Sequence, residues 1–343
     1  MRNITYRVDV LRGNIPYSEL VFSSPPTVYM DDGADIKASL RGTFRRNDNI
    51  NYLSDELRPV MILGGTEYPL GVYRVATKKE TVTAQGAMYD EIEAYDRAVI
   101  LEWAKLESRD FWAAGTAYTD IISNYLTRAG ITRAAVTPSA AVLQSDREDW
   151  DIGTQYLNII NTLLAEINYK ALFFDLEGNA RVEPYAPPSV ANIAHTYGAG
   201  EGLTLLRPGH SAEIDVFSQP NVFIAILENP EYPEPLVKTA VNDTPSSPLS
   251  TVSRGIRIPH VVKVNNIASE ADLQDYVNRL RDNSVQLSEV VTVATAAMPN
   301  HNAGDTVAIS APAVQGIFKE ISWSLTLGTG AEMTHELQRV VLI

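Results

Sequence analysis

The densest run of acidic side chains is the first place where this chain could carry chemistry. Asp146, Glu148, Asp149 and Asp151 lie in one short stretch, and a pair of carboxyl groups is what a glycosidase uses as acid and as base or nucleophile. The same side chains could supply oxygen ligands to calcium. We favour a plainer interpretation, because acids placed just before a helix are stabilised by the positive end of its dipole. No catalytic residue is therefore assigned to this run.

The histidines lack the spacing that a local metal or catalytic motif would need. No two of them are placed to put two ligands on one helix face, and no His-Glu-x-x-His motif occurs. His210, Glu213 and Asp215 are close in sequence, but in a strand His210 would face away from both acids. We therefore expect neither a zinc site nor an acid-base group among the histidines, which are His195, His210, His260, His301 and His335.

Three further motifs are weak candidates for ligand binding. Residues 31–35 resemble the start of a calcium loop but lack its regular order of aspartates. The glycine-rich residues 198–202 contain no lysine, so they do not predict a phosphate-binding loop. Arg41, Arg45 and Arg46 form a basic patch without interleaved aromatic residues, and contact with an acidic neighbouring chain explains it as well as nucleic acid does. No cofactor is predicted.

The composition excludes several classes of protein. Cysteine is absent, which removes disulfides, thiolate metal sites and cysteine nucleophiles and is compatible with folding in a reducing cytoplasm. The 42 acidic and 28 basic residues give a net charge of −14, so attraction of the whole surface to nucleic acid or anionic lipid is disfavoured. With 343 residues, 45% of them hydrophobic and 20% charged, the chain is expected to be globular with two or three domains.

The sequence predicts neither export nor membrane insertion. Charged residues interrupt each apolar stretch of residues 1–12, so no signal peptide is expected there. The longest apolar stretches, near Ile160 and Val290, are too short to span a bilayer. We therefore do not expect the chain to insert stably into a membrane.

The elements that would position these residues begin with strands. Apolar residues alternate with polar ones over residues 4–10 and 36–44, as in strands with one buried face. Residues 60–63 and 70–75, joined through a glycine turn, and residues 88–95 continue the pattern. We therefore expect residues 1 to about 100 to be mostly β.

A repeated helical unit follows. An apolar stripe with the spacing of one helix face comprises Tyr118, Ile121, Ile122, Tyr125 and Leu126. The signature Gly-Thr-x-Tyr of residues 115–118 returns at residues 153–156, ahead of a second amphipathic stretch. These matches predict two helices that pack through their apolar faces, with Thr116 and Thr154 as their N-caps.

The remaining chain is predicted to alternate strands with one helix. Residues 172–185 predict a hairpin, and the five prolines between residues 229 and 248 predict a long connection without regular structure. A capping-box pattern at residues 269–272 opens a helix. Strands are expected at residues 256–264, 290–294, 306–310, 316–327 and 337–342.

The order of these pieces resembles the baseplate hub, or tail hub, proteins of tailed bacteriophages and phage-tail-like particles. The likeness covers nearly the full chain. It is carried by residues 70–75 (Leu-Gly-Val-Tyr-Arg-Val), 91–97 (Glu-Ile-Glu-Ala-Tyr-Asp-Arg), 114–122, 150–154 (Trp-Asp-Ile-Gly-Thr), 168–185, 220–223 (Pro-Asn-Val-Phe) and 240–251.

The resemblance implies an α+β, mostly β fold with two related β-barrel tube domains and an inserted helical domain. Residues 1–105 would form the first tube domain, completed by about residues 200–228. Residues 106–199 would form the insert, with two amphipathic helices and a hairpin, and residues 229–343 the second tube domain with one helix. A non-enzymatic structural role is implied, with no catalytic, cofactor-binding or metal-binding residue and no module that degrades the cell wall.

The resemblance also implies the partners. They would be further copies of this chain in a homotrimer, the tail tube or distal tail protein, and the tip or spike protein. The ring would join the hexameric tube to the trimeric tip of a virion tail made in the host cytoplasm, and its acidic wall would let DNA pass without specific binding.

Two other functions stay open. One is a carboxylate hydrolase acting on the cell wall through the acidic run at residues 146–151, with Trp150 or Tyr156 as an aromatic platform. The other is a carbohydrate-binding or receptor-binding tail component that uses exposed members of the 16 tyrosines.

Overall fold

The computed structural model describes residues 4–148, 150–198, 204–205, 209–213, 219–227, 235–264, 267, 269–286, 289–312 and 314–340. Over these residues the protein is mostly β, as the sequence predicts. Its first region consists of strands β1 (Ile4–Arg12), β2 (Ile15–Leu20), β3 (Thr27–Asp31), β4 (Ala38–Arg45), β5 (Glu56–Leu63), β6 (Thr66–Pro69), β7 (Tyr73–Val82) and β8 (Met88–Asp96).

This first β region folds around the alternating apolar residues. Leu40 and Phe44 on β4 are fully buried, and they share a core with Leu57 on β5 and Ile92 on β8. Neighbouring strands pair antiparallel, for example β4 with β8 and β1 with β5. The expectation that the first hundred residues are mostly β is confirmed.

A single sheet continues from this region into the second half of the chain. The strands added there are β12 (Ile193–Gly198), which follows the short 3-10 helix η1 (Val190–Asn192), β13 (Thr204–Leu205), β14 (Ser211–Glu213), β18 (Val290–Ala296), β19 (Thr306–Ser310), β20 (Gln315–Thr326) and β21 (Glu332–Arg339). Among the described strands the main pairing path runs from β13 to β2 and closes no barrel.

Strand β20 joins the two β regions. Its first half pairs with β19, and its second half pairs with β3, while β21 follows its other edge. Phe318 in the first half lies in a core with Val307 and Leu337. Trp323 and Leu325 in the second half lie in the core of the first β region. One continuous strand therefore contributes to two hydrophobic cores.

The last predicted strand is displaced toward the N-terminus. The sequence predicts a strand at residues 337–342, whereas β21 spans Glu332–Arg339. Met333, His335 and Leu337 point inward on β21 and are fully buried, whereas Thr334 and Glu336 are exposed. The alternation of apolar and polar residues in β21 is not recognisable in the sequence, because one of its buried residues is His335.

The helical insert contains the two helices predicted from the repeat. Its elements are α1 (Ala98–Trp103), α2 (Tyr118–Arg128), β9 (Ala134–Val136), α3 (Tyr156–Glu166), β10 (Phe173–Phe174) and β11 (Ala180–Val182). The predicted stripe of α2 is buried and shares one core with the apolar residues of α3. Residues 173–174 and 180–182 pair as the expected hairpin.

The predicted helix caps are wrong. Neither Thr116 nor Thr154 is an N-cap, and neither helix has a side-chain cap hydrogen bond. Thr116 instead donates its hydroxyl to the carbonyl of Ala113, and Thr154 donates to that of Asp151, both at 2.7 Å. The glycine before each threonine has a positive φ, +82° and +92°. The repeated signature therefore encodes a tight turn that leads into each helix.

A third group of elements contains a small sheet covered by a helix. Its elements are β15 (Val222–Leu227), β16 (Leu236–Val241), α4 (Thr251–Arg254), β17 (Pro259–Val264) and α5 (Glu270–Gln286). Strand β16 corrects the expectation of a connection without regular structure between residues 229 and 248, because it pairs with β15 over six residues. The prolines at 235 and 245 flank this strand and do not interrupt it.

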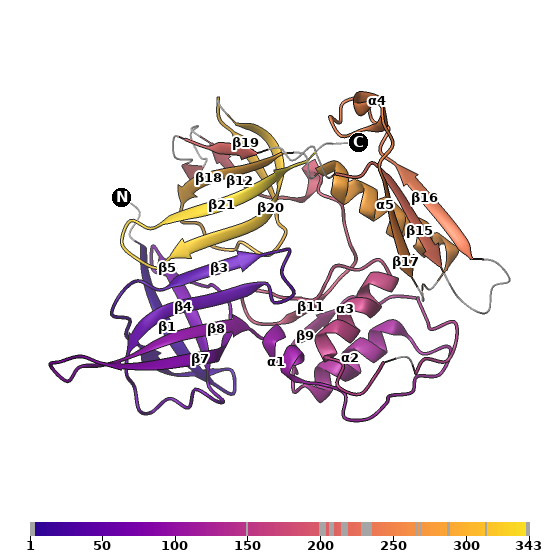
Figure 1. The fold of residues 1–343 in the computed structure, drawn as a ribbon. Coiled ribbons are helices and arrows are strands. Elements are labelled where there is room, and N and C mark those ends of the chain that lie inside the picture. The colour runs from indigo at the N-terminus through magenta and orange to yellow at the C-terminus, as the bar shows by residue number, and fades with distance from the viewer. Residues whose placement is uncertain are drawn as a thin grey trace.

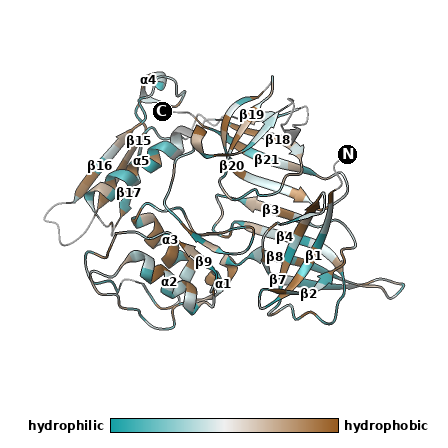
Figure 2. Ribbon diagram, turned by 180° about the vertical axis from the view of Figure 1, so that it is seen from behind, coloured by the Kyte–Doolittle hydropathy of each residue, from teal (hydrophilic) through white to brown (hydrophobic). Residues whose placement is uncertain are grey.

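The capping box of α5 is confirmed. The backbone N–H of Asp272 donates to Oγ of Ser269 at 3.1 Å, and Leu273 and Val277 on the same helix are fully buried against the small sheet. Figure 1 shows the two β regions side by side, the helices of the insert beside the first, and the small sheet with α5 as a third group. Apolar residues line α2, α3 and β16 in Figure 2. Among the described residues no helix is long and apolar enough to cross a membrane.

Candidate functional site

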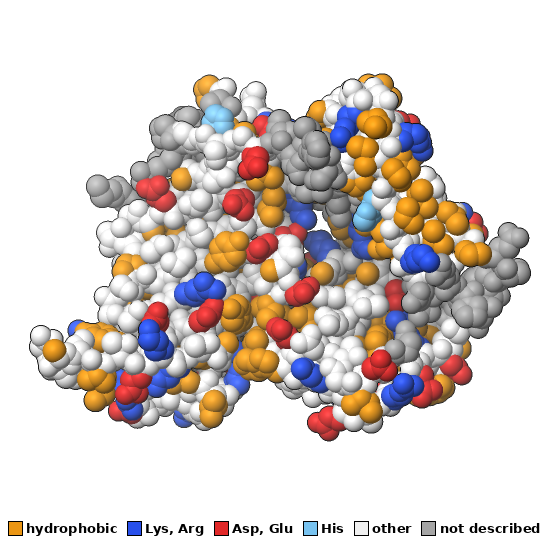
Figure 3. Space-filling model, viewed as in Figure 1, with side chains coloured by type: hydrophobic (Ala, Val, Ile, Leu, Met, Phe, Trp, Pro, Cys, Tyr) orange, Lys and Arg blue, Asp and Glu red, His pale blue; other side chains and the backbone are white. Residues whose placement is uncertain are grey.

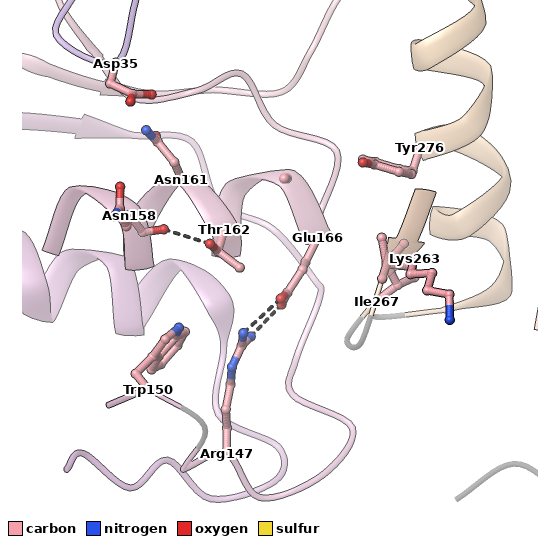
Figure 4. Close-up of a pocket in the computed structure, with 12 residues that line it drawn as sticks. Asp35, Arg147, Trp150, Asn158, Asn161, Thr162, Glu166, Lys263, Ile267 and Tyr276 are labelled. Carbon is pink, nitrogen blue, oxygen red and sulfur yellow. Dashed lines mark hydrogen bonds and ion pairs between the residues drawn. The ribbon is translucent and has the colours of Figure 1, made fainter. Parts of the chain in front are cut away.

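The candidate binding site is a cavity of about 530 Å³ between the insert and the third group of elements (Figure 4). Helix α3 supplies Asn161 and Glu166 on one side, and Arg147 comes from the loop that precedes this helix. Lys263 of β17 and Tyr276 of α5 line the other side. The cavity therefore depends on two parts of the fold that are far apart in sequence.

The most strongly fixed feature of this cavity is an ion pair. Arg147 binds Glu166 through Nη1–Oε2 at 2.6 Å and Nη2–Oε1 at 2.9 Å, and the two side chains are only 5% and 9% exposed. The guanidinium also lies 4.2 Å from the centre of the Trp150 ring. Two parallel hydrogen bonds and an aromatic face leave these groups little freedom to turn toward a ligand.

The side chains that line the cavity offer hydrogen bonds and charge to a ligand. Among the lining residues that the structure describes there is no serine, cysteine or histidine, so no nucleophile with an adjacent imidazole base is present in that set. Glu166 is held by Arg147, and the Asn161 side-chain oxygen accepts from the backbone N–H of Leu172 at 2.9 Å. The arrangement suits a polar ligand or a protein segment.

A second cavity of about 620 Å³ lies where the insert, α5 and the sheet meet. Its charged lining residues are Lys37, Lys170, Arg279, Lys319, Asp32 and Asp305. Lys319 pairs with Asp32 at 2.6 Å. Arg279 donates to the carbonyl of Tyr169 at 3.0 Å and lies over the ring of Tyr276. Burial lowers the pKa of Arg279. Figure 3 shows basic side chains around the hollow at the centre of this face.

The acidic run that suggested a hydrolase is held in structural contacts. Asp146 accepts a hydrogen bond from the backbone N–H of Ala114 at 2.8 Å, and Asp151 pairs with Arg109 at 3.2 Å. Glu148 is exposed, and Asp149 lies outside the described residues. Trp150 lines the cavity, but neither Asp146 nor Asp151 is a lining residue.

Of the other sequence candidates, only the turn at residues 31–35 has described members in the cavities, with Asp35 lining the first and Asp32 the second. His210 and Glu213 are exposed near β14, while Asp215 and residues 199–202 lie outside the described residues. Asp31 accepts from the backbone N–H of Gly33 at 2.8 Å, as in an ordinary turn. In the basic patch, Arg41 pairs with Glu93 at 2.5 Å and Arg46 with Asp48 at 2.6 Å.

A buried polar cluster is the feature that sequence analysis misses. His195 on β12, His301 in the loop after β18 and His335 on β21 come together around Glu320 on β20. The exposed fractions of the His301, Glu320 and His335 side chains are 1%, 1% and 0%. No local motif could reveal this cluster, since its members come from separate strands and one loop.

The cluster forms one chain of hydrogen bonds. Nδ1 of His301 lies 2.7 Å from Oε2 of Glu320, and Nδ1 of His335 contacts Oε1 of the same carboxylate. The other ring nitrogens, which we call outer because they do not contact Glu320, have hydroxyl partners. Nε2 of His335 lies 2.8 Å from the hydroxyl of Thr295, and Nε2 of His301 contacts the hydroxyl of Tyr197. Burial raises the pKa of Glu320, but the two histidines outweigh burial and lower it to about 2.

Burial is the main cause of the pKa shifts of two neighbouring groups, His195 and Asp305. The ring of His195 stacks on that of His301 with centroids 3.8 Å apart. Burial and the nearby His301 lower the pKa of His195 to about 4. Burial raises the pKa of Asp305 to about 6.

Comparison with solved structures identifies the fold. Over 98% of this chain and 97% of the other, the structure matches the tail protein from Neisseria meningitidis MC58, with a TM-score of 0.70 and 11% sequence identity. The protein has the fold of phage tail proteins. It also matches the 43 kDa tail protein of prophage MuSo2 from Shewanella oneidensis over 98% of both chains, with a TM-score of 0.67 and 10% identity.

A third match is also a tail protein, similar over nearly the full chain at low sequence identity. The prophage tail protein gp18 from Listeria monocytogenes matches over 96% of this chain and 94% of that chain, with a TM-score of 0.58 and 13% identity. The sequence itself matches no family model and no curated protein. The fold is therefore shared with tail proteins that are only 10–13% identical to this chain.

Proposed function

We propose that this protein is a baseplate hub in the tail tip of a phage or phage-tail-like particle. Three copies would form a ring that joins the hexameric tail tube to the trimeric tip or spike and leaves a channel for DNA. The observation that carries the proposal is the tail-protein fold, which extends over 98% of the chain. Its role is structural and non-enzymatic, acting through protein contacts at the end of a virion tail.

The two β regions support the proposed tube domains. Each has its own hydrophobic core, and β20 contributes to both. In the proposal, residues 1–105 form one tube domain, residues 106–199 the insert and residues 229–343 the other tube domain. The resemblance implies that residues 200–228 complete the first tube domain, but their described strands pair elsewhere: β13 and β14 with the second β region and β15 with the small sheet. A shared strand would fix the angle between the two tube domains, which a rigid ring requires.

An exposed strand edge offers a surface for contacts between copies. Among the described strands, β2 pairs with β1 alone, and its side chains Ile15 and Tyr17 are 68% and 41% exposed. An unpaired strand edge with apolar side chains is a ready contact for another chain. We propose that this edge lies in an interface of the assembled ring.

The net charge of −14 suits a channel for DNA. A wall with the same sign of charge as the phosphate backbone avoids the adhesive contacts that lysine and arginine would make. The proposal therefore requires acidic residues to outnumber basic ones on the surface that faces the ring axis, and a basic channel in an assembled ring would contradict this part of it.

Light scattering and negative-stain imaging of the full chain test the ring. The proposal predicts a mass three times the 37.7 kDa chain and rings with threefold symmetry, either alone or after addition of tail tubes or tip proteins, since a template can drive closure. A chain that stays monomeric in the presence of both templates would overturn the ring.

The hydrolase alternative has its own test. Changing Glu148 and Asp149 to their amides and measuring peptidoglycan release separates a carboxylate enzyme from a structural protein. The structural proposal predicts no release from the parent protein, whereas release that the amides abolish would favour the enzyme. For the carbohydrate-binding alternative, binding of the chain to a glycan array would be the supporting result.

A further inference from the structure

We infer that His301, Glu320 and His335 form an interior site for a divalent transition metal of the zinc class. Histidine nitrogens and carboxylate oxygens are common zinc ligands, and sites with two histidines and one glutamate are well known in proteins. The inference concerns the stability of the folded chain and does not depend on the proposed hub function.

The donor atoms are in direct hydrogen-bond contact with one another. Both Nδ1 atoms are directed at the carboxylate of Glu320, one to each oxygen, with His301 at 2.7 Å. Two nitrogens and two carboxylate oxygens therefore supply four donor atoms from three side chains. The ligand atoms of the three side chains lie within 4.8 Å of one another, so one ion could be reached by all three after small side-chain adjustments.

The outer hydrogen bonds fix the orientation of the rings. The hydroxyl of Thr295 lies 2.8 Å from Nε2 of His335 and 3.1 Å from the carbonyl of Ala296. Metal-binding histidines commonly donate their second ring nitrogen to such a partner, which fixes the tautomer and leaves Nδ1 for the ion.

A proton or a metal cation must lie between each histidine and the carboxylate. Each Nδ1 faces one oxygen of Glu320, and a lone pair facing a carboxylate is repulsive. One proton on each histidine or a single metal ion shared by both can fill this role. A metal ion would replace both inner protons.

The surrounding charges favour a doubly charged ion. Glu320 provides one negative charge, and Asp305 provides a second, with its ligand atom within 4.8 Å of that of His301. A divalent ion beside these two carboxylates is electrically balanced. Such balance matters because an uncompensated charge in a buried site is strongly disfavoured.

The position indicates a structural role for the ion. Glu320 and His335 lie on neighbouring strands β20 and β21, and His301 lies in the loop between β18 and β19. Trp323, in the core of the first β region, has its ring 6.4 Å from that of His301. A bound ion would fasten this loop to the strands at the place where the two β cores meet.

The test uses the full chain without an affinity tag, refolded with zinc chloride or with a chelator. Because the site is buried, refolding gives the ion access. We expect about one zinc per chain by elemental mass spectrometry and a Tm higher with zinc than with the chelator. Refolding with cobalt should give the visible absorption bands of a four-coordinate ion.

Two variants and a control decide the result. H335Q keeps an amide N–H that can still donate to Glu320, so it can fold while losing a ligand, and E320Q removes the charged ligand. H260Q changes an exposed histidine on β17 and serves as the control. We expect the two site variants to lose the zinc and the Tm difference, and H260Q to keep both. Equal zinc content in the parent and H335Q, or a Tm that does not respond to zinc in the parent, would overturn the inference and leave a network of protons.

Discussion

Arg147 and Glu166 form a buried, two-bond ion pair at the edge of the cavity shown in Figure 4, with N–O distances of 2.6 and 2.9 Å. The pair fastens the loop before α3 to the end of that helix. Removing one partner would take the opposite charge away from the buried group that remains, and breaking a buried ion pair in this way typically costs about 3–5 kcal/mol. The pair therefore stabilises the insert rather than serving as a reactive group.

We predict that Arg147→Met lowers the free energy of unfolding by about 3 kcal/mol or more. The double variant R147M/E166M should be less destabilised than the sum of the two single variants, because it leaves no unpaired charge. Urea unfolding followed by circular dichroism measures both quantities. Strictly additive losses would contradict the ion pair.

The turn between β10 and β11 depends on a glycine. Gly178 has a φ of +75°, and a Cβ built there would lie 2.8 Å from Cβ of Val72. Gly86 has a similar φ of +80° with nothing within 4 Å of the added atom. We predict that Gly178→Ala destabilises the chain by more than Gly86→Ala, since backbone strain of about 1–3 kcal/mol is common to both and only Gly178 adds a clash.

Thermal unfolding of the two alanine variants measures this difference directly. The carbonyl of Gly178 also accepts a hydrogen bond from Arg97 at 2.7 Å, so a displaced turn would weaken the link between the insert and the first β region. Equal Tm values for the two variants would show that Val72 moves aside without a loss of stability, and would refute the predicted clash.

Asp96 gives the fold a pH dependence. It is 4% exposed, and burial raises its pKa to about 6 despite hydrogen bonds from the backbone N–H groups of Ala98 and Ala38. The folded state therefore holds this proton more tightly than the unfolded chain, where the pKa is about 3.9. The stability that Asp96 contributes is complete below about pH 4 and is lost as pH rises through about 6.

We predict that Asp96→Asn destabilises the protein less at pH 7 than at pH 4. The difference should be on the order of 3 kcal/mol, because the pKa of Asp96 differs by about two between the folded and unfolded states and each unit of pKa corresponds to 1.36 kcal/mol. The asparagine does not titrate, so the difference between the two proteins isolates Asp96. Urea unfolding of both at several pH values measures the change. If Asp96→Asn instead destabilises the protein more as pH rises, the folded state favours the ionised carboxylate of Asp96.

The exposed edge of β2 gives a prediction about assembly. Ile15→Glu should reduce incorporation of the chain into purified tails, because a charge at this edge opposes pairing with another chain. Leu53→Glu is a matched control, since Leu53 is 87% exposed but lies in a turn outside any strand. Incorporation is measured by quantitative mass spectrometry of the tails, and equal incorporation of both variants would argue against the β2 interface.

Periodic local signals made much of the fold predictable. Alternation located β4 and β19, the apolar stripe located α2, and the pairing of Ser269 with Asp272 located the start of α5. These elements are visible in sequence because burial and hydrogen bonding repeat at a fixed spacing along the chain. The proline-flanked strand β16 was not predicted, because its pairing with β15 supplies the order that its local sequence does not indicate.

The candidate sites could not be predicted because they depend on contacts between distant segments. Arg147 and Tyr276 line one cavity from two separate parts of the fold. His301 and His335 meet only because the loop after β18 folds over β20 and β21. In addition, His335 occupies a position on β21 that an alternating pattern assigns to an apolar residue, so the pattern hides it.

We propose that this chain is a structural link at the tip of a tail, and imaging of the assembled particle decides whether it is. Particles made from the genome that encodes the chain, resolved by electron cryomicroscopy, should show three copies as a ring between the tail tube and the tip, with an open channel along the axis. Tails that are complete without this chain at their tip would contradict the account.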